Sequence, residues 1–143
     1  MSDPFDLNRF LQAQLNVYEG VLIELGAGAK TGHWMWYVFP QIIGLGKSPT
    51  TRRYAIKSAA EAVAYLEHTV LGVRLLQCTR LVYGLSGRSV EKIFGFPDNL
   101  KFCSSMTLFA EVSSEEIFNR VLEKYFEAKP DMATTDILKG LEQ

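Results

Sequence analysis

Signals for the beginning and the end of helices recur along almost the whole chain. Ser58 with Glu61, and Ser113 with Glu116, fit the capping box, in which a serine and a glutamate three residues later bond the first free N–H groups of a helix. Apolar residues follow at spacings of three and four, and glycine or proline ends most of these segments. This pattern predicts a mainly α protein, built as a single multihelical domain over residues 1–143.

The first predicted helix is the longest. Apolar residues recur at helical spacing between Leu7 and Leu25, and Gly28 follows as an end signal. We expect one amphipathic helix of about twenty residues here, with Asp3 or Asp6 capping its start. The further segments predicted to be helical are residues 58–67, 70–85, 89–94, 98–110, 113–126 and 134–141.

The composition excludes several classes of protein. The 143 residues suffice for one domain, and the shares of 48% hydrophobic and 22% charged residues are close to those of average globular domains. This balance argues against a disordered chain. Lys and Arg total 15 against 16 Asp and Glu, which gives a net charge of −1. We therefore expect no broad basic face and no binding to duplex nucleic acid.

Signals for a membrane, a metal or a secretory route are missing from the sequence. No apolar stretch approaches the roughly 20 residues of a membrane helix, and the N-terminus does not resemble a signal peptide. Cys78 and Cys103 are too few for a disulfide scaffold and lie far apart in sequence, so we expect two buried or half-buried thiols. His33 and His68 show no metal-ligand spacing. We expect a cytoplasmic protein that binds no membrane, no metal and no cofactor.

A loop rich in small residues spans positions 26–32 and contains Lys30. It differs from a phosphate-binding loop of the Walker type, because alanine precedes the lysine and a helix precedes the loop. The loop is better explained as a helix end followed by a turn. Lys30 can still contact an anion, but only as a point charge.

Both tryptophans of the chain lie in one aromatic run. Trp34 and Trp36 stand between His33 and Gln41, and the run is short enough for either an extended strand or a single buried turn. One interpretation is an aromatic plug in the core. The other is a wall for a flat ligand ring, with His33 and Gln41 donating or accepting hydrogen bonds at its two ends. In an extended run, Trp34 and Trp36 would share one face.

Two arginines, Arg52 and Arg53, precede Tyr54 at the expected start of a helix. Cations are unfavourable at that end of the helix dipole, so the sequence breaks a local rule there. Arginines beside free backbone N–H groups form phosphate or carboxylate sites, and we take Arg52, Arg53 and Tyr54 as candidate ligand-binding residues. The alternative is a pair of solvated arginines.

A third cluster begins at Asp98. Asp98 and Lys101 share a helix face at a spacing of three, and Ser104 and Ser105 follow on the same element. Asp98 and Lys101 are candidate catalytic residues, as acid or base and as charge clamp, while the two serines are candidate hydrogen-bonding groups for a ligand. The alternative is a helix-capping aspartate with an ordinary ion pair.

Together these segments resemble the DUF1810 family over residues 3 to about 128. The strings His-Trp-Met-Trp and Lys-x-x-Ser-Ser-Met-Thr-Leu-Phe are the most specific part of the resemblance. One departure is Phe102-Cys103, where the family is expected to carry a Leu-Arg pair, so a charge is missing there. The matching segments are Asp3–Phe10, Gly32–Gln41, Arg52–Ile56, Ile93–Gly95 with Pro97-Asp98, and Leu100-Lys101 with Ser104–Phe109.

The resemblance implies a mainly helical fold but no settled activity. Some family members carry a calpastatin label, although inhibitors of that kind resemble disordered repeats and this chain is rich in apolar residues. The family is also similar at the level of fold to the YbiA/NADAR group, which acts on N-glycosidic bonds of riboflavin intermediates and ADP-ribosylated compounds. This is an analogy between folds.

Three classes of function follow from these expectations. The first is an N-glycosidase-like enzyme that acts on a phosphorylated nucleotide or an ADP-ribose derivative, with a stacked base, a carboxylate beside the developing cation and a basic phosphate clamp. The second is a non-catalytic module that binds a nucleotide or a protein partner. The third is a structural or oligomerisation role.

Overall fold

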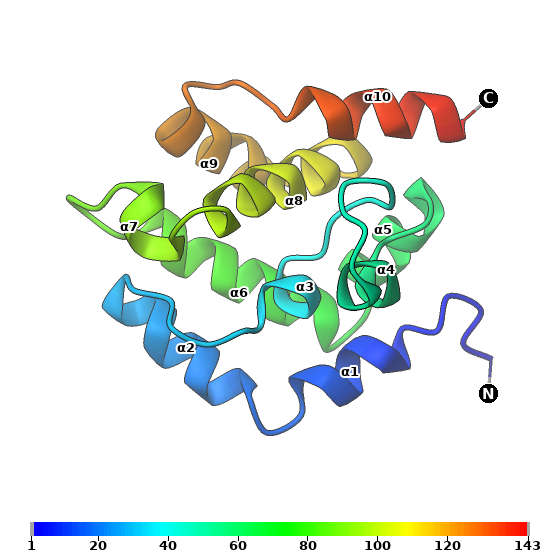
Figure 1. Cartoon of the computed structure of the whole chain (residues 1–143), viewed down its shortest axis with the longest axis horizontal. Helices are drawn as coiled ribbons and strands as arrows, with labels where there is room; N and C mark the ends of the chain where they lie inside the picture. The colour runs from blue at the N-terminus through cyan, green and yellow to red at the C-terminus, as the bar shows by residue number, and fades with distance from the viewer. Residues whose placement is uncertain (1, 143) are drawn as a thin grey trace.

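The computed structural model describes residues 2–142, and these residues form ten helices (Figure 1). The predicted mainly α architecture is confirmed. In this described part of the chain, no helix has both the length and the apolar character needed to span a membrane. The helices are α1 (Asn8–Gln14), α2 (Tyr18–Ala27), α3 (Met35–Val38), α4 (Pro49–Tyr54), α5 (Ala59–Glu67), α6 (Leu71–Tyr83), α7 (Val90–Phe94), α8 (Asp98–Val112), α9 (Glu116–Phe126) and α10 (Met132–Leu141).

The prediction of one helix over residues 7–25 is wrong. The segment breaks between α1 and α2, where Asn16 adopts a left-handed φ of 69°, and Figure 1 shows the two helices meeting at an angle. The reason is tertiary: the buried side chain of Gln14 donates to the carbonyl of Tyr37 at 2.7 Å. The break lets α1 pack on α3 while α2 packs on α6.

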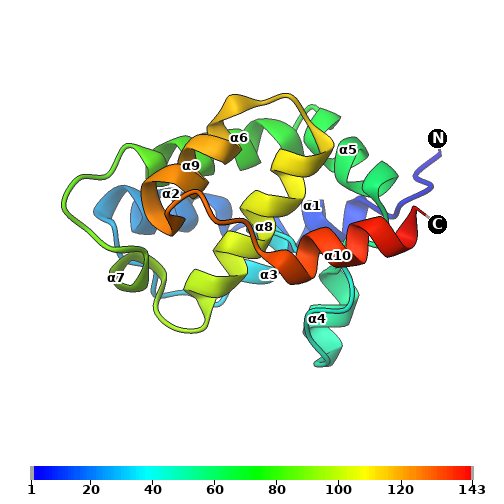
Figure 2. The ribbon, with the colours of Figure 1, turned by 90° about the horizontal axis from the view of Figure 1, so that it is seen from above.

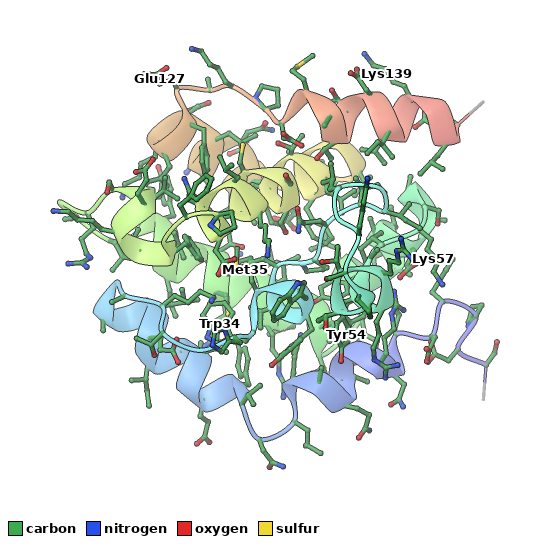
Figure 3. The ribbon with its side chains drawn as sticks, viewed as in Figure 1. Trp34, Met35, Tyr54, Lys57, Glu127 and Lys139 are labelled. Carbon is green, nitrogen blue, oxygen red and sulfur yellow. The ribbon has the colours of Figure 1, made fainter. Side chains whose placement is uncertain are left out.

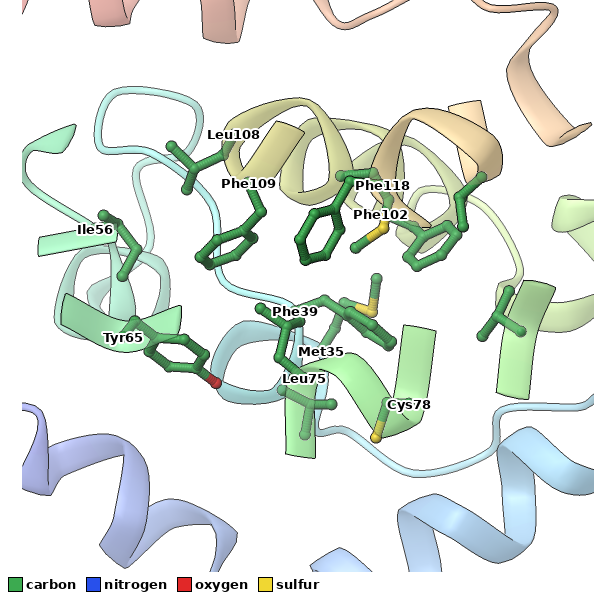
Figure 4. Packing of buried hydrophobic residues seen from close by; sticks show 14 of the residues in the cluster. Met35, Phe39, Ile56, Tyr65, Leu75, Cys78, Phe102, Leu108, Phe109 and Phe118 are labelled. Carbon is green, nitrogen blue, oxygen red and sulfur yellow. The ribbon is translucent and has the colours of Figure 1, made fainter. Parts of the chain in front are cut away.

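Helix α8 organises the core and packs against α5, α7, α9 and α10 (Figure 2). Its residue Phe102 is fully buried and stacks on Phe94 with ring centres 4.5 Å apart, and it meets the edge of Phe39 at 5.0 Å. Figure 4 shows Phe39 and Phe102 converging with Phe109 and Phe118. Each buried phenylalanine contributes about 1.5–3 kcal/mol, so this aromatic centre fixes the position of α8.

The aromatic run at residues 34–39 is a single helical turn, α3, and not a strand. Of the two alternatives left by the sequence, the extended one is therefore wrong. Met35 and Val38 point into the core, and Phe39 is fully buried. Pro40 follows and prevents the turn from continuing.

A buried ion pair holds the base of α4. Arg9 donates to a carboxylate oxygen of Glu61 at 2.6 Å, and the two side chains are 6% and 3% exposed. The same guanidinium donates to the carbonyls of Arg53 at 2.8 Å and Ala55 at 2.9 Å. Ile42 and Ile56, on either side of α4 in the sequence, form an isolated parallel bridge that closes the base of this segment. Helix α4 itself projects from the body of the molecule in Figure 2.

Several predicted caps differ from those observed. Ser58 accepts from the backbone N–H of Glu61 as expected, but the Glu61 carboxylate bonds Arg9 and the N–H of Lys57 and so does not complete the box. Ser113 donates to the carbonyl of Phe109 instead of capping α9. In these cases a tertiary or preceding partner outcompetes the local cap.

Candidate functional site

A groove of about 410 Å³ lies along the first half of α8. The loop that leads into α4 forms one wall, and the connection from α9 to α10 forms the other. Its lining mixes polar with apolar groups, as is usual for sites that bind small molecules. The polar lining residues are Gln41, Thr51, Lys101, Ser104 and Asp131, and the larger apolar ones are Leu45, Leu100, Phe126 and Met132.

Two lysines contact Asp98 at the start of α8, and of these three residues only Lys101 lines the groove. Nζ of Lys101 lies 3.4 Å from one carboxylate oxygen of Asp98, at the predicted spacing of one helical turn. Nζ of Lys30 lies 2.8 Å from the other oxygen. We call these three residues the Lys–Asp–Lys cluster. The sequence indicated Lys30 as a point charge for an anion, but its partner Asp98 is too distant in sequence to be identified from spacing.

Each lysine of the cluster also lies over an indole ring. Lys30 Nζ is 5.1 Å from the centre of the Trp34 ring, and Lys101 Nζ is 5.2 Å from that of Trp36. The side chain of Lys30 is 6% exposed, whereas that of Lys101 is 26% exposed. Lys30 is therefore the buried end of the cluster, which we call its closed end. Lys101 is the partly exposed end, which we call its open end, and it lines the groove.

The loop that carries Lys30 is fixed by Glu24. Its carboxylate accepts from the backbone N–H groups of Thr31 at 2.6 Å and Gly32 at 2.8 Å, and from the indole N–H of Trp34 at 3.0 Å. Burial raises the pKa of Glu24, but these hydrogen bonds outweigh it and leave the pKa below its usual value. A Cβ on Gly32 would lie 2.9 Å from the Trp34 ring, so this position requires glycine.

The two tryptophans have different roles. Trp34 is buried, which matches the core interpretation and not the ligand wall. Trp36 is half-buried and lines a small hollow with Gln41, Thr51 and Tyr54 beside the groove. Trp34 and Tyr54 lie on opposite sides of α3 in Figure 3. The expectation that Trp34 and Trp36 share one face was tied to an extended run and is wrong.

Arg52 and Arg53 lie at the opposite end of their helix from that expected. Helix α4 begins at Pro49, so both arginines are in its last turn, where the dipole favours cations. The two arginines therefore follow the preference of cations for the C-terminal end of a helix, and the argument for an anion site at a helix start no longer applies. Both side chains are exposed outside the groove lining, and the guanidinium of Arg53 lies 5.5 Å from the centre of the Tyr54 ring.

The serines of α8 also separate. Ser104 lines the groove, and its hydroxyl lies 3.1 Å from the carbonyl of Leu100 and 3.2 Å from a carboxylate oxygen of Asp131. Ser105 is fully buried outside that lining, and among residues 2–142 its hydroxyl has no hydrogen-bond partner. His33 is exposed on its loop and does not line the groove.

Asp131 is a groove residue that the sequence reasoning missed. Its side chain caps α10 by accepting from the N–H of Thr134 at 3.0 Å and from its hydroxyl at 2.5 Å. The signal was present, because Asp131 stands between Pro130 and a helical segment. Cys103 also lines the groove, but burial raises the pKa of its thiol to about 11, so it stays protonated at neutral pH.

No group of three or more His, Cys, Asp or Glu side chains in the described part of the chain is placed to hold a metal ion. The described site therefore consists of a mixed groove, one partly exposed lysine beside an aromatic ring, and polar side chains at hydrogen-bonding distance from one another. Such a site can bind a ligand that carries both an anionic group and a ring.

Comparisons with known proteins place the chain in a family. The crystal structure of the conserved hypothetical protein Rv1873 from Mycobacterium tuberculosis is similar, with 54% sequence identity and a TM-score of 0.95, over 96% of this chain and 99% of that one. No curated protein matches. The model of the family described as "Protein of unknown function (DUF1810)" matches residues 4–138. The chain therefore belongs to the DUF1810 family.

Proposed function

We propose that the groove along α8 binds a phosphorylated, nucleotide-like small molecule. Its volume of about 410 Å³ lies within the range of roughly 300–1,000 Å³ that is usual for such sites. The lining offers both hydrogen-bonding groups and apolar surface, which a nucleoside requires. Of the residues expected from the sequence to bind a ligand, Gln41 and Ser104 line the groove itself, and Trp36 and Tyr54 line the adjoining hollow.

The observation that carries the proposal is the position of Lys101. This lysine lines the groove, is partly exposed, and lies 5.2 Å from the centre of the Trp36 ring. A phosphate on Lys101 would therefore lie next to the half-buried Trp36 ring, while the base would occupy the larger groove, because the hollow at Trp36 holds only about 10 Å³. Gln41 and Thr51 line both the groove and the hollow, so their side chains are placed to bond a sugar or a base edge between the two.

Thermal unfolding with ADP-ribose, NAD and flavin precursors tests the proposal. A ligand at a hundredfold its dissociation constant stabilises the folded protein by about 2.7 kcal/mol, which raises the melting temperature by several degrees in a domain of this size. The Lys101→Gln variant should lose most of the shift. Lys139→Gln, an exposed lysine on α10 outside the groove, is the matched control and should keep it. Absence of a shift with every compound would contradict the proposal and favour a protein partner.

A second candidate is N-glycosidase-like chemistry at the same site, as the fold analogy to the YbiA/NADAR group implies. It is favoured by Asp98, whose side chain is 20% exposed beside the groove residue Lys101. A carboxylate beside C1′ can stabilise a developing oxocarbenium ion. In this reaction the bond from C1′ to the base nitrogen breaks, the electron pair leaves with the base, and water supplies a hydroxyl to C1′. With NAD the pyridinium leaves as neutral nicotinamide, so the remaining proton of the water is released to the solvent.

An assay of nicotinamide release from NAD, measured by chromatography, distinguishes the enzyme hypothesis from the binding hypothesis. If the protein is an enzyme, the wild type releases the base and Asp98→Asn stops the release while the ligand still raises the melting temperature. If the protein only binds, neither form releases base although both are stabilised. The Lys139→Gln control should behave as the wild type in either case.

A further inference from the structure

The two lysines of the Lys–Asp–Lys cluster hold Asp98 unequally. Lys30 approaches to 2.8 Å with a side chain only 6% exposed, while Lys101 remains at 3.4 Å and is 26% exposed. A distance of 3.4 Å is long for a charge-assisted hydrogen bond. The contact between Asp98 and Lys30 is therefore the stronger one, and the contact with Lys101 is the one that can be exchanged.

Lys30 is also fixed by contacts other than Asp98. Its ammonium donates to the carbonyl of Gly32 at 2.5 Å, and its backbone N–H donates to the carbonyl of Ile93 at 2.7 Å. Lys101 stands in the first turn of α8 on a flexible four-carbon stem and lines the groove. A rotation of its side chain into the groove moves no backbone, whereas Lys30 cannot leave without disrupting its loop.

The charges of the cluster do not cancel. Two lysines and one aspartate leave one positive charge, and because Lys30 neutralises Asp98 at the closed end, the excess lies on Lys101. The excess charge of the cluster therefore lies at the groove, whose lining also carries one carboxylate, that of Asp131, which is bonded to Ser104 and to the start of α10. An anionic group that enters the groove meets a cation whose internal partner is already satisfied by another lysine.

We infer that Asp98 is a displaceable internal counter-ion, and that the phosphate of the ligand takes its place on Lys101 while Lys30 retains Asp98. This inference rests on the proposed function and deepens it. It names the ammonium group of Lys101 as the group that binds the phosphate, and the contact between Lys101 and Asp98 as the one that is exchanged. The ligand class is a phosphate ester or diphosphate of a nucleoside. Asp98 lowers the affinity for such ligands, because it competes for the same ammonium group.

Isothermal titration of the full-length protein with ADP-ribose, at constant ionic strength, tests the exchange. Loss of a charged hydrogen-bond donor in Lys101→Gln should weaken binding by about tenfold or more. Asp98→Asn should instead tighten it by a few-fold, because the competitor has lost its charge while the amide can still accept from Lys30. Lys139→Gln should bind as the wild type. An Asp98→Asn variant that binds ADP-ribose no more tightly than the wild type would overturn the inference.

A second measurement avoids variants altogether. In the wild-type protein, saturation with ADP-ribose should shift the carboxyl carbon resonance of Asp98, since one of its two cations leaves. An unchanged resonance in the saturated protein would overturn the exchange while leaving nucleotide binding intact. If ADP-ribose and the other compounds of the panel fail to bind the wild type, the proposed function fails instead.

Discussion

Two groups of cations and carboxylates join parts of this molecule that are distant in sequence, and they differ in how far their side chains are buried from solvent. The pair of Arg9 and Glu61 is almost fully buried, and its guanidinium also donates to backbone carbonyls at the base of α4. The Lys–Asp–Lys cluster is closed at Lys30 but open at Lys101. A group whose donors are all used holds the fold, whereas one with a partly exposed, weakly held cation is available to a ligand.

The largest expected effect is at the closed pair. Arg9→Met leaves the carboxylate of Glu61 buried without its cation, which should cost about 3–5 kcal/mol of unfolding free energy. Urea unfolding followed by circular dichroism measures this. The double variant Arg9→Met with Glu61→Gln removes the buried charge and should recover part of the loss. Equal stability of Arg9→Met and the wild type would show that the pair does not hold the fold.

A smaller effect is expected at the closed end of the cluster. Lys30→Met removes the contacts to Asp98 and to the carbonyl of Gly32, which should lower the free energy of unfolding by about 1–2 kcal/mol. The loss is smaller than at Arg9 because Asp98 is partly exposed and solvent screens its charge. The measurement is again urea unfolding. A cost as large as that of Arg9→Met would mean that the cluster is a second structural pair.

The loop that carries Lys30 should respond to pH through Glu24. Hydrogen bonds hold the pKa of Glu24 below its ordinary value of 4.5 in the folded state, so its stabilisation is present above that value and is lost as the pH falls through the lower folded pKa. Glu24→Gln should cost about 1 kcal/mol at neutral pH. Unfolding free energies measured from pH 7 to pH 3 should converge for the two proteins, and a gap that widens on acidification would contradict the assignment.

The smallest effect on stability is expected at the open end. Lys101→Gln removes a partly exposed contact of 3.4 Å and should change the unfolding free energy by less than about 0.5 kcal/mol, although it weakens ligand binding. Thermal unfolding without ligand, in parallel with Lys139→Gln, checks this. If Lys101→Gln destabilises the protein as much as Lys30→Met, the distinction between a closed and an open end fails.

The fold was predictable where local signals decide it. The bounds of α5 to α8 follow from caps and apolar spacing close to the chain positions expected, and Ser89 caps α7 as predicted. The break at Asn16 was not predictable, because Gln14 is buried against the carbonyl of Tyr37, which is remote in sequence. The same holds for the bonds from Arg9 to the carbonyls of Arg53 and Ala55, which lie more than forty residues away in sequence.

The site was predictable in part for the same reason. Asp98 and Lys101 meet because one helix spaces them, and this contact could be read from the sequence. Lys30 reaches Asp98 only through the fold, and Arg52 and Arg53 were misplaced because the start of α4 at Pro49 was not identified. Contacts within one helix follow from spacing, whereas contacts between elements require the structure.

The most direct test of the account uses the two tryptophans as reporters. Trp34 is buried with its indole N–H bonded to Glu24, whereas Trp36 is half-buried in the hollow beside the groove. Nuclear magnetic resonance of the wild-type protein titrated with ADP-ribose follows both indole N–H signals. The account predicts that the Trp36 signal moves to saturation while the Trp34 signal stays in place. A Trp36 signal that does not move at any ADP-ribose concentration would contradict binding in this groove.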